Sequence, residues 1–179
     1  TMPESMSIER RKLFDLLGAK VILTSAADGM KGALDEAVSI MNKNPDTFMP
    51  NQFSNPTNPE CHYATTAEEI LADTDGSLDV LVAGVGSGGS LSGIARKLKE
   101  RLPHVKAVAV EPENSAILSG GMPGPHAIQG IGAGFIPPIL DRELIDDVVG
   151  VSDGRALELA QLCARQEGIA CGISSGAVL

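Results

Sequence analysis

The chain has 179 residues, of which 43% are hydrophobic and 21% are charged, and its formal net charge is −9 at pH 7. This length and composition predict a packed globular core and exclude a disordered chain. The negative charge disfavours a nucleic-acid or anionic-membrane surface, and no apolar run approaches the roughly 20 residues that span a bilayer. We therefore expect a soluble, cytoplasmic protein, with an organelle as the alternative location.

Helix-like and strand-like segments alternate along the chain. Apolar residues at helical spacing predict helices over residues 7–17, 30–42, 66–72 (opened by a Thr cap) and 90–101, and a helix capped by Asp153 that runs to about residue 166. Apolar runs predict strands over residues 20–24, 80–85, 107–110 and 147–151, with a candidate strand over 47–50 and the clearest buried strand at 80–85. Met2 and Pro3 are expected to lie among loop residues. The alternation predicts an α/β fold with a mostly parallel sheet covered by helices.

A glycine-rich segment stands where the clearest buried strand meets a helix. Residues 80–100 read VLVAGVGSGGSLSGIARKLKE, with five glycines within ten residues. Glycines let backbone N–H groups approach a ligand, and the helix that follows presents unpaired N–H groups and the positive end of its dipole. Three serines add hydroxyl donors, namely Ser87, Ser90 and Ser92. The segment therefore predicts an anion site.

The pattern alone leaves alternatives open. Gly84, Gly86 and Gly89 fit a bare GxGxxG spacing, for which Glu111 would be the acidic residue that holds a ribose. A Walker loop is excluded because no GK[ST] sequence follows. The glycines could also serve only a tight strand-to-helix turn.

Other residue types indicate little further chemistry. The three cysteines (Cys61, Cys163 and Cys171) lack zinc-ligand or disulfide spacing, so we expect free thiols and no metal site. The single tyrosine and the absence of tryptophan exclude an aromatic stacking platform. His104 and His126 are expected as surface or loop residues.

Several segments together resemble one enzyme family. GVGSGGSLSG at residues 84–93 looks like the phosphate-binding loop of the cysteine synthase (O-acetylserine sulfhydrylase) family of fold-type II pyridoxal-phosphate enzymes. Further segments agree in order along the chain: MPESMSIERR at 2–11, QFSNPTNPE at 52–60, AVEPENS at 109–115, PGPHAIQGIGAGFIP at 123–137 and GISSGA at 172–177. The resemblance implies a three-layer α/β fold, present incompletely, with helices on both faces of the sheet. Residues 1–52 would end a smaller N-terminal domain, and residues 53–179 would form most of a larger cofactor-phosphate domain.

The resemblance also implies how pyridoxal 5′-phosphate is held. Its phosphate would lie against the loop residues Gly86, Ser87, Gly88, Gly89 and Ser90, where the family carries threonines in place of the two serines. Ser174 matches the residue whose neutral hydroxyl faces the pyridine nitrogen, which favours β-elimination over transamination. The alternative role for Ser174 is a helix N-cap, and its neighbour Ser175 is the other candidate for each role.

Substrate-binding residues follow from the same resemblance. Gln52 matches a residue that helps to bind the amino-acid substrate, although a surface amide is the ordinary interpretation of such a residue. Gly130, Ile131, Gly132 and Ala133 match the wall of the active-site mouth, with a rigid crossover loop as the alternative. His62 aligns with a position near the entrance.

Two family motifs are absent from the sequence. None of its seven lysines has the S-V-K-[DN]-R setting of the lysine that forms an imine with the cofactor, and no T-S-G-N-T-G substrate loop is present. Lys31 is a tempting substitute, but a solvated helix face is its ordinary interpretation. We therefore expect no catalytic residue in this segment and place the Schiff-base lysine upstream, in a longer protein that also continues beyond Leu179.

The implied activity is replacement of acetate in O-acetyl-L-serine by sulfide, which gives L-cysteine. The alternatives are a β-replacement of the cystathionine β-synthase or serine sulfhydrylase type, and a non-catalytic binding protein that keeps the fold. The expected partners are O-acetylserine, sulfide, a second copy in a homodimer, and the C-terminal tail of serine acetyltransferase.

Overall fold

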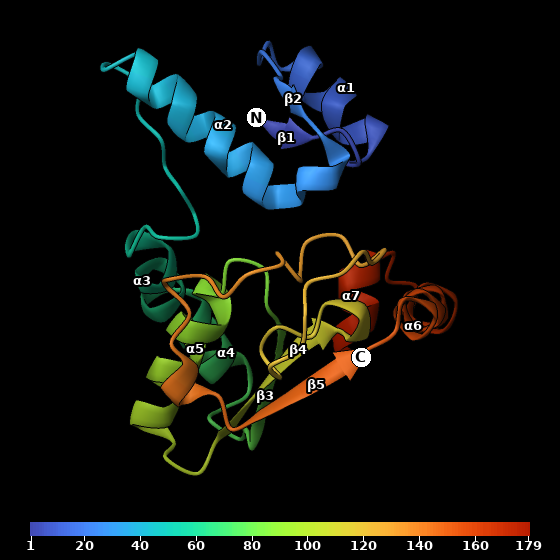
Figure 1. The fold of residues 1–179 in the computed structure, drawn as a ribbon. Coiled ribbons are helices and arrows are strands. Elements are labelled where there is room, and N and C mark those ends of the chain that lie inside the picture. Colours follow the sequence, from blue (N-terminus) through green and yellow to red (C-terminus); the bar gives the residue numbers. More distant parts are fainter. The chain divides into compact units, whose positions relative to one another are not determined.

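The structure is a computed structural model that describes all 179 residues. The chain divides into two compact units, residues 1–50 (the N-terminal unit) and residues 51–179 (the C-terminal unit), each of which is drawn in Figure 1. A compact unit is not by itself an independently folding domain, so the domain boundary expected after residue 52 stays a prediction.

The N-terminal unit is a small α/β structure. In chain order it contains β1 (Met2–Pro3), α1 (Ile8–Leu16), β2 (Leu23–Thr24), the 3₁₀ turn η1 (Ala26–Asp28) and α2 (Gly29–Lys43). The two short strands are parallel, and Ala33 of α2 is buried in this unit together with Met2. Gly18 has a φ of 77° just beyond α1, a left-handed conformation that glycine adopts readily and that commonly follows the end of a helix.

Two local predictions in this unit are wrong. Met2 and Pro3 form β1 because the Met2 N–H donates to the Ile22 carbonyl at 3.0 Å and the Glu4 N–H donates to the Thr24 carbonyl at 2.9 Å. Residues 47–50 follow a turn at residues 45–46 and are not a strand, because they form no ladder with a neighbouring strand.

The C-terminal unit is built on a parallel sheet with the strand order β3-β4-β5. Its strands are β3 (Val80–Gly84), β4 (Lys106–Pro112) and β5 (Asp147–Val151). Its helices are α3 (Thr57–Ala64), α4 (Thr66–Asp73), α5 (Gly89–Arg101), α6 (Asp153–Gln166) and α7 (Ile173–Val178), with 3₁₀ turns η2 (Glu113–Ser115) and η3 (Arg142–Leu144). All three strands run in one direction, so their carboxyl ends meet at the same edge of the sheet.

Helices cover both faces of this sheet (Figure 1). On one face, Ala107 and Ala109 of β4 pack with Leu91 and Ala95 of α5. On the other face, Val110 packs with residues of α6 and α7 and with the long loop between β4 and β5. Successive side chains of β4 point to opposite faces of the sheet and so belong to two separate cores. This confirms the expected three-layer α/β arrangement.

The strand at 80–85, which the sequence indicates as the clearest buried strand, lies at an edge of the sheet and is partly exposed. Val80 and Val82 of β3 are 46% and 44% exposed, whereas Ala107 and Ala109 of the central strand β4 are fully buried. The apolar run at 80–85 predicts a strand correctly. Hydropathy does not distinguish an edge strand from a central one, because the difference depends on which strands lie beside it.

Helix α3 and two helix caps differ from the expectations. Two prolines and two asparagines precede or open α3, but Pro59 lies in its first turn, where no backbone N–H is needed. The α6 cap is Ser152, whose hydroxyl accepts from the Arg155 N–H at 3.3 Å, and not Asp153. Thr65 precedes α4 without capping it, because its hydroxyl donates to the Cys61 carbonyl at 2.8 Å.

Helices α3 and α5 approach each other closely. A methyl group on Gly93 of α5 would collide with the Pro59 carbonyl oxygen and would lie 2.9 Å from the Tyr63 nitrogen. A methyl group on Gly89 would collide with the Asn58 amide. Residues four apart share one face of a helix, so Gly89 and Gly93 form the groove that receives α3.

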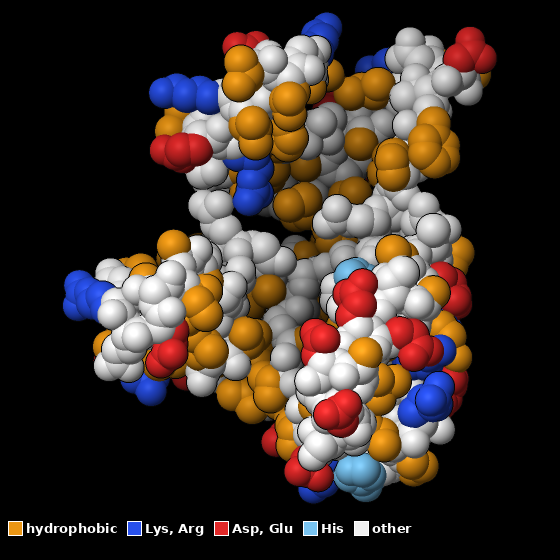
Figure 2. Space-filling model, turned by 180° about the vertical axis from the view of Figure 1, so that it is seen from behind, with side chains coloured by type: hydrophobic (Ala, Val, Ile, Leu, Met, Phe, Trp, Pro, Cys, Tyr) orange, Lys and Arg blue, Asp and Glu red, His pale blue; other side chains and the backbone are white.

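The surface carries both apolar and acidic side chains. Figure 2 shows hydrophobic side chains on each unit and acidic side chains gathered on the viewed face of the C-terminal unit. Among the exposed apolar residues, Leu16, Phe48 and Met122 are each at least 80% exposed. No helix in the chain combines the length and the apolar character that crossing a membrane requires.

The groove predicts that a glycine-to-alanine substitution has opposite effects on stability at residues 93 and 154. We expect Gly93→Ala to lower the free energy of unfolding by about 1–3 kcal/mol, because the added methyl group has no space beside α3. Gly154→Ala is the matched control, because nothing lies within 4 Å of its added methyl group, and we expect it to raise stability by up to about 1 kcal/mol. Urea denaturation of both variants measures the difference. Equal effects of the two substitutions would contradict a tight groove.

Candidate functional site

The turn from β3 to α5 forms the centre of the site. Gly88 precedes the helix in the left-handed conformation with a φ of 84°, and no side chain caps the helix. The backbone N–H groups of residues 86–90 have no acceptor within the protein. They lie at the carboxyl end of the sheet, at the start of a 13-residue helix whose dipole adds a positive potential. This turn can therefore hold an anion without a cationic side chain.

Two hydroxyls beside the turn are held by α3. The Asn58 amide Nδ2 donates to the Ser87 Oγ at 3.0 Å, and the His62 Nε2 lies 3.0 Å from the Ser90 Oγ. Asn58 and His62 are four residues apart and so lie on one face of α3. The third serine, Ser92, is buried and accepts from the Asp141 N–H at 2.9 Å, so it supports a neighbouring loop instead.

The loop at 130–133 packs directly against the glycine-rich turn. A methyl group on Gly86 would collide with the Gly130 carbonyl oxygen, and one on Gly84 would lie 2.8 Å from the Ile131 side chain. The Gly132 N–H donates to the Val85 carbonyl at 3.0 Å. The structure therefore brings together two segments, predicted as phosphate and substrate sites, that lie at least 40 residues apart.

Helix α7 brings Ser174 to the same place. A methyl group on Gly130 would lie 3.8 Å from the Ser174 Oγ, and this hydroxyl has no hydrogen-bond partner within the protein. The N-cap of α7 is Gly172, so the expected capping role of Ser174 or Ser175 is wrong, because both residues lie inside the first turn. The side chain beside the 130–133 loop is that of Ser174.

Gln52 belongs to the C-terminal unit and is exposed. Its backbone carbonyl accepts from the Asn58 Nδ2 at 2.8 Å, which ties this segment to α3. Its role in substrate binding stays a prediction. His104 is exposed as expected, and His126 lies in the loop, where its Nε2 is 3.0 Å from the Gly132 carbonyl oxygen.

The lysines of the C-terminal unit stand at positions on α5 and β4 that are distant from the glycine-rich turn. Lys97 and Lys99 stand in the second half of α5 and pair with Glu68 and Asp146 at 2.7 and 2.6 Å. Lys106 opens β4, at the opposite end of the sheet from the turn. In the N-terminal unit, Lys31 is exposed and pairs with Asp35 at 3.2 Å, as expected of a solvated helix face.

The Glu111 carboxylate is committed to the loop that follows it. It is buried and accepts from the Leu118 N–H at 2.7 Å, the Ser119 N–H at 3.0 Å and the Ser119 hydroxyl at 2.6 Å. A carboxylate engaged in this way is not available to a ribose. The dinucleotide alternative for the glycine-rich turn therefore loses its acidic partner.

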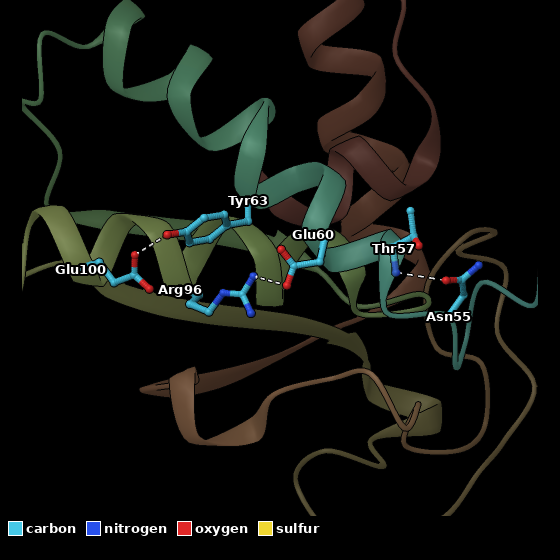
Figure 3. Close-up of polar contacts among 6 residues, drawn as sticks. All are labelled: Asn55, Thr57, Glu60, Tyr63, Arg96 and Glu100. Atoms are coloured by element: carbon cyan, nitrogen blue, oxygen red, sulfur yellow. Dashed lines mark hydrogen bonds and ion pairs between the residues drawn. The ribbon is translucent and has the colours of Figure 1, made fainter.

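Polar contacts also join α3 to α5 (Figure 3). Glu60 accepts from Arg96 at 2.8 Å, and the Tyr63 hydroxyl donates to Glu100 at 2.6 Å. The Tyr63 ring carries two cations, with the Arg96 Cζ at 4.4 Å and the Lys97 Nζ at 4.2 Å from its centre. These contacts help to hold α3 in the position from which Asn58 and His62 reach the serines.

The residues at the turn fit a phosphoester of pyridoxal. A phosphate dianion needs several donors in a small space, and the turn presents free N–H groups with two hydroxyls beside them. The glycines leave no Cβ atom between this backbone and the neighbouring segments. Ser174, on α7, adds a neutral hydroxyl beside the loop that packs on the turn.

Comparisons with known proteins identify the class. A family model described as pyridoxal-phosphate dependent enzyme matches residues 1–179, so the chain belongs to this family, whose cofactor is pyridoxal phosphate. The chain is 50% identical to cysteine synthase A of Escherichia coli over 188 residues, which covers all of this chain and 58% of the relative. The chain thus spans little more than half the length of the curated relatives that it matches.

Solved structures agree with this assignment. A cysteine synthase from Entamoeba histolytica superposes with a TM-score of 0.91 at 46% identity, covering 98% of this chain and 52% of that one. An O-acetylserine dependent cystathionine β-synthase from Helicobacter pylori superposes with a TM-score of 0.94 at 43% identity, covering 98% of this chain and 57% of that one. These neighbours confirm the expected fold-type II architecture.

Sequence reasoning missed Asn58. The expectation for residues 52–60 was a segment carrying Gln52, and no helix was predicted there. The signal that could have found Asn58 is the four-residue spacing between Asn58 and His62, which matches the spacing between Gly89 and Gly93.

The contact with Glu100 predicts the titration of Tyr63. The hydrogen bond to the carboxylate raises the pKa of the phenol above its ordinary value of about 10, because ionisation would lose this bond and create two facing negative charges. Lys97 and Arg96 lower this pKa, so we expect Glu100→Gln to bring it down towards or below the ordinary value. Ultraviolet absorbance against pH reports this group alone, because the chain has one tyrosine and no tryptophan.

Glu69→Gln on α4 is the control for this titration. It removes one exposed carboxylate of the same unit that has no contact with the phenol, so the midpoint should not move. A Tyr63 midpoint that stays in place in Glu100→Gln would contradict the contact between the two side chains.

Proposed function

We propose that the chain supplies the cofactor-phosphate site and part of the substrate site of a cysteine synthase. In this proposal the phosphate of pyridoxal 5′-phosphate binds to residues 86–90. The observation that carries the proposal is the uncapped turn into α5, where five free backbone N–H groups stand beside the hydroxyls of Ser87 and Ser90. Membership of a pyridoxal-phosphate family makes a cofactor phosphate the anion of choice.

The side chains of the site have distinct tasks in this proposal. The N–H groups and the two serine hydroxyls bind the phosphate and so fix the position of the cofactor. Ser174 offers its hydroxyl to the pyridine nitrogen, and Gln52 with residues 130–133 binds and encloses the substrate. When bound, pyridoxal phosphate withdraws electrons from the substrate and so assists loss of a proton and of a leaving group.

The proposed reaction replaces the acetate of O-acetyl-L-serine by sulfide and yields L-cysteine and acetate. The Escherichia coli and Entamoeba histolytica relatives named as cysteine synthases support this choice. The Helicobacter pylori neighbour, named as an O-acetylserine dependent cystathionine β-synthase, supports a second candidate in which a larger thiol is the nucleophile. Both candidates share O-acetylserine and differ in the sulfur donor.

The wider biology of the proposal rests on the family resemblance alone. It comprises a homodimer, recognition of the C-terminal tail of serine acetyltransferase, and a cytoplasmic location. The division into a small domain ending at residue 52 and a cofactor-phosphate domain from residue 53 belongs to the same proposal.

The absence of a lysine at the turn predicts no turnover by residues 1–179 alone. A positioned base contributes about 10²–10⁴ in rate, and none of the lysines of the C-terminal unit stands at residues 86–90. We expect cysteine formation when residues 1–179 replace the matched part of Escherichia coli cysteine synthase A, because this chimera restores the remaining part of that enzyme. The assay measures cysteine from O-acetylserine and sulfide with added cofactor.

The chimera separates the proposal from its alternatives. A chimera that binds the cofactor but accepts only homocysteine as the sulfur donor would favour the cystathionine-forming candidate. A folded chimera that binds the cofactor and turns over neither donor would favour a binding protein. Turnover by residues 1–179 alone, with borohydride reduction fixing the cofactor to Lys31, would make Lys31 the catalytic lysine.

The position of the Ser174 hydroxyl predicts a difference between two adjacent serines. In the protein as its gene encodes it, Ser174→Ala should lower kcat/KM about tenfold, the cost of one lost hydrogen bond, and shift the visible absorption spectrum of the bound cofactor. Ser175→Ala is the matched control and should leave both unchanged. The opposite pattern would assign the pyridine nitrogen to Ser175.

A further inference from the structure

We propose that Asn58 is a positioning residue for the cofactor phosphate, acting through the hydroxyl of Ser87. The inference rests on the proposed function, because it takes residues 86–90 as the phosphate site. Asn58 would not touch the phosphate. Its amide would fix the direction of the Ser87 O–H bond.

The hydrogen bonds of the Asn58 amide determine which atom donates. The Gln52 backbone carbonyl can only accept, so the amide atom 2.8 Å from it is the NH₂ group. The same NH₂ group lies 3.0 Å from the Ser87 Oγ and donates its second proton there. The Ser87 oxygen is therefore an acceptor in this contact, and its own proton remains to be donated elsewhere.

No protein atom accepts that proton. The Ser87 hydroxyl forms its one hydrogen bond with Asn58, while the N–H groups beside it at residues 86–90 also lack acceptors. The hydroxyl and the N–H groups are thus donors that share one region of the turn. An anion placed there satisfies all of them, and the Asn58 amide occupies one lone pair of the Ser87 oxygen, which leaves the O–H to be directed at the anion.

The position of Asn58 is held from several sides. Its N–H donates to the Asn55 carbonyl at 3.1 Å, and its amide occupies the space that a Cβ atom on Gly89 would need. The contacts of Glu60 and Tyr63 with α5 fix the helix that carries it (Figure 3). Because the Asn58 side chain is held in this way, the Ser87 hydroxyl that it orients has little freedom to rotate.

A double-mutant cycle on the protein as its gene encodes it tests the inference. The probe is pyridoxine 5′-phosphate, which lacks the aldehyde, so its affinity for the apoprotein by equilibrium dialysis does not depend on a lysine. We expect Asn58→Leu to weaken this affinity about tenfold. In the Ser87→Ala background the same change should weaken it no more than about twofold, because the hydroxyl that Asn58 orients is gone.

Asn58→Asp provides a second, nearly isosteric variant. Its carboxylate can only accept, so the Ser87 proton turns towards it and a negative charge stands beside the phosphate. We expect a loss of affinity of about a hundredfold and a changed ³¹P chemical shift of the bound phosphate. If Asn58→Leu does not fold, Asn58→Asp is compared in the two backgrounds, and its loss should be clearly smaller in Ser87→Ala than in the unaltered protein, because only the charge repulsion remains there.

Cys61→Ala is the control on the same helix. It removes an exposed thiol that contacts Thr65 and neither serine, so affinity and ³¹P shift should stay as in the unaltered protein. Equal losses from Asn58→Leu in both backgrounds, with an unchanged ³¹P shift, would overturn the inference and leave Asn58 a packing role. Failure of the unaltered protein to bind the probe would instead overturn the proposed phosphate site itself.

Discussion

Helix α3 lies so close to α5 that residues 89 and 93 of α5 have to be glycine. A methyl group at either position would meet the Asn58 amide or the Pro59 carbonyl. Because the helices meet so closely, the short side chains of Asn58 and His62 can reach the serines at the start of α5. The anion site thus depends on packing within the C-terminal unit as much as on its own glycines.

The proposed site would bind negative charge inside an acidic protein. The chain carries a net charge of −9, and acidic side chains gather on a face of the C-terminal unit (Figure 2). Its lysines stand in the second half of α5 and at the start of β4, away from the turn. The attraction for an anion must therefore come from oriented N–H and O–H dipoles, which act at short range and are fixed in direction before a ligand arrives.

The carboxyl end of the sheet gathers segments that are distant in sequence. The turn after β3, the loop at 130–133 and the first turn of α7 meet there because all three strands are parallel. Two buried polar side chains stabilise the loops at this edge of the sheet. The Glu111 carboxylate accepts hydrogen bonds from the loop at 118–119, and the Ser92 hydroxyl accepts one from the Asp141 N–H. These two polar groups, which resemble site residues in the sequence, therefore stabilise the surrounding structure and take no part in the site.

The amino-acid sequence by itself determined the elements that depend on local pattern. The strand at 147–151, the helix ending at 166 and the glycine-rich turn before α5 follow from hydrophobic period and from glycine, and the ordered motifs were enough to indicate the family. The tertiary structure decided that β3 is an edge strand, that a proline-containing segment forms α3, and that Ser174 rather than Ser175 lies beside Gly130. It also decided that the Ser87 oxygen accepts from Asn58, 29 residues away. Burial, neighbours and the direction of a hydrogen bond depend on atoms that only the folded chain brings together, and no local pattern carries that information.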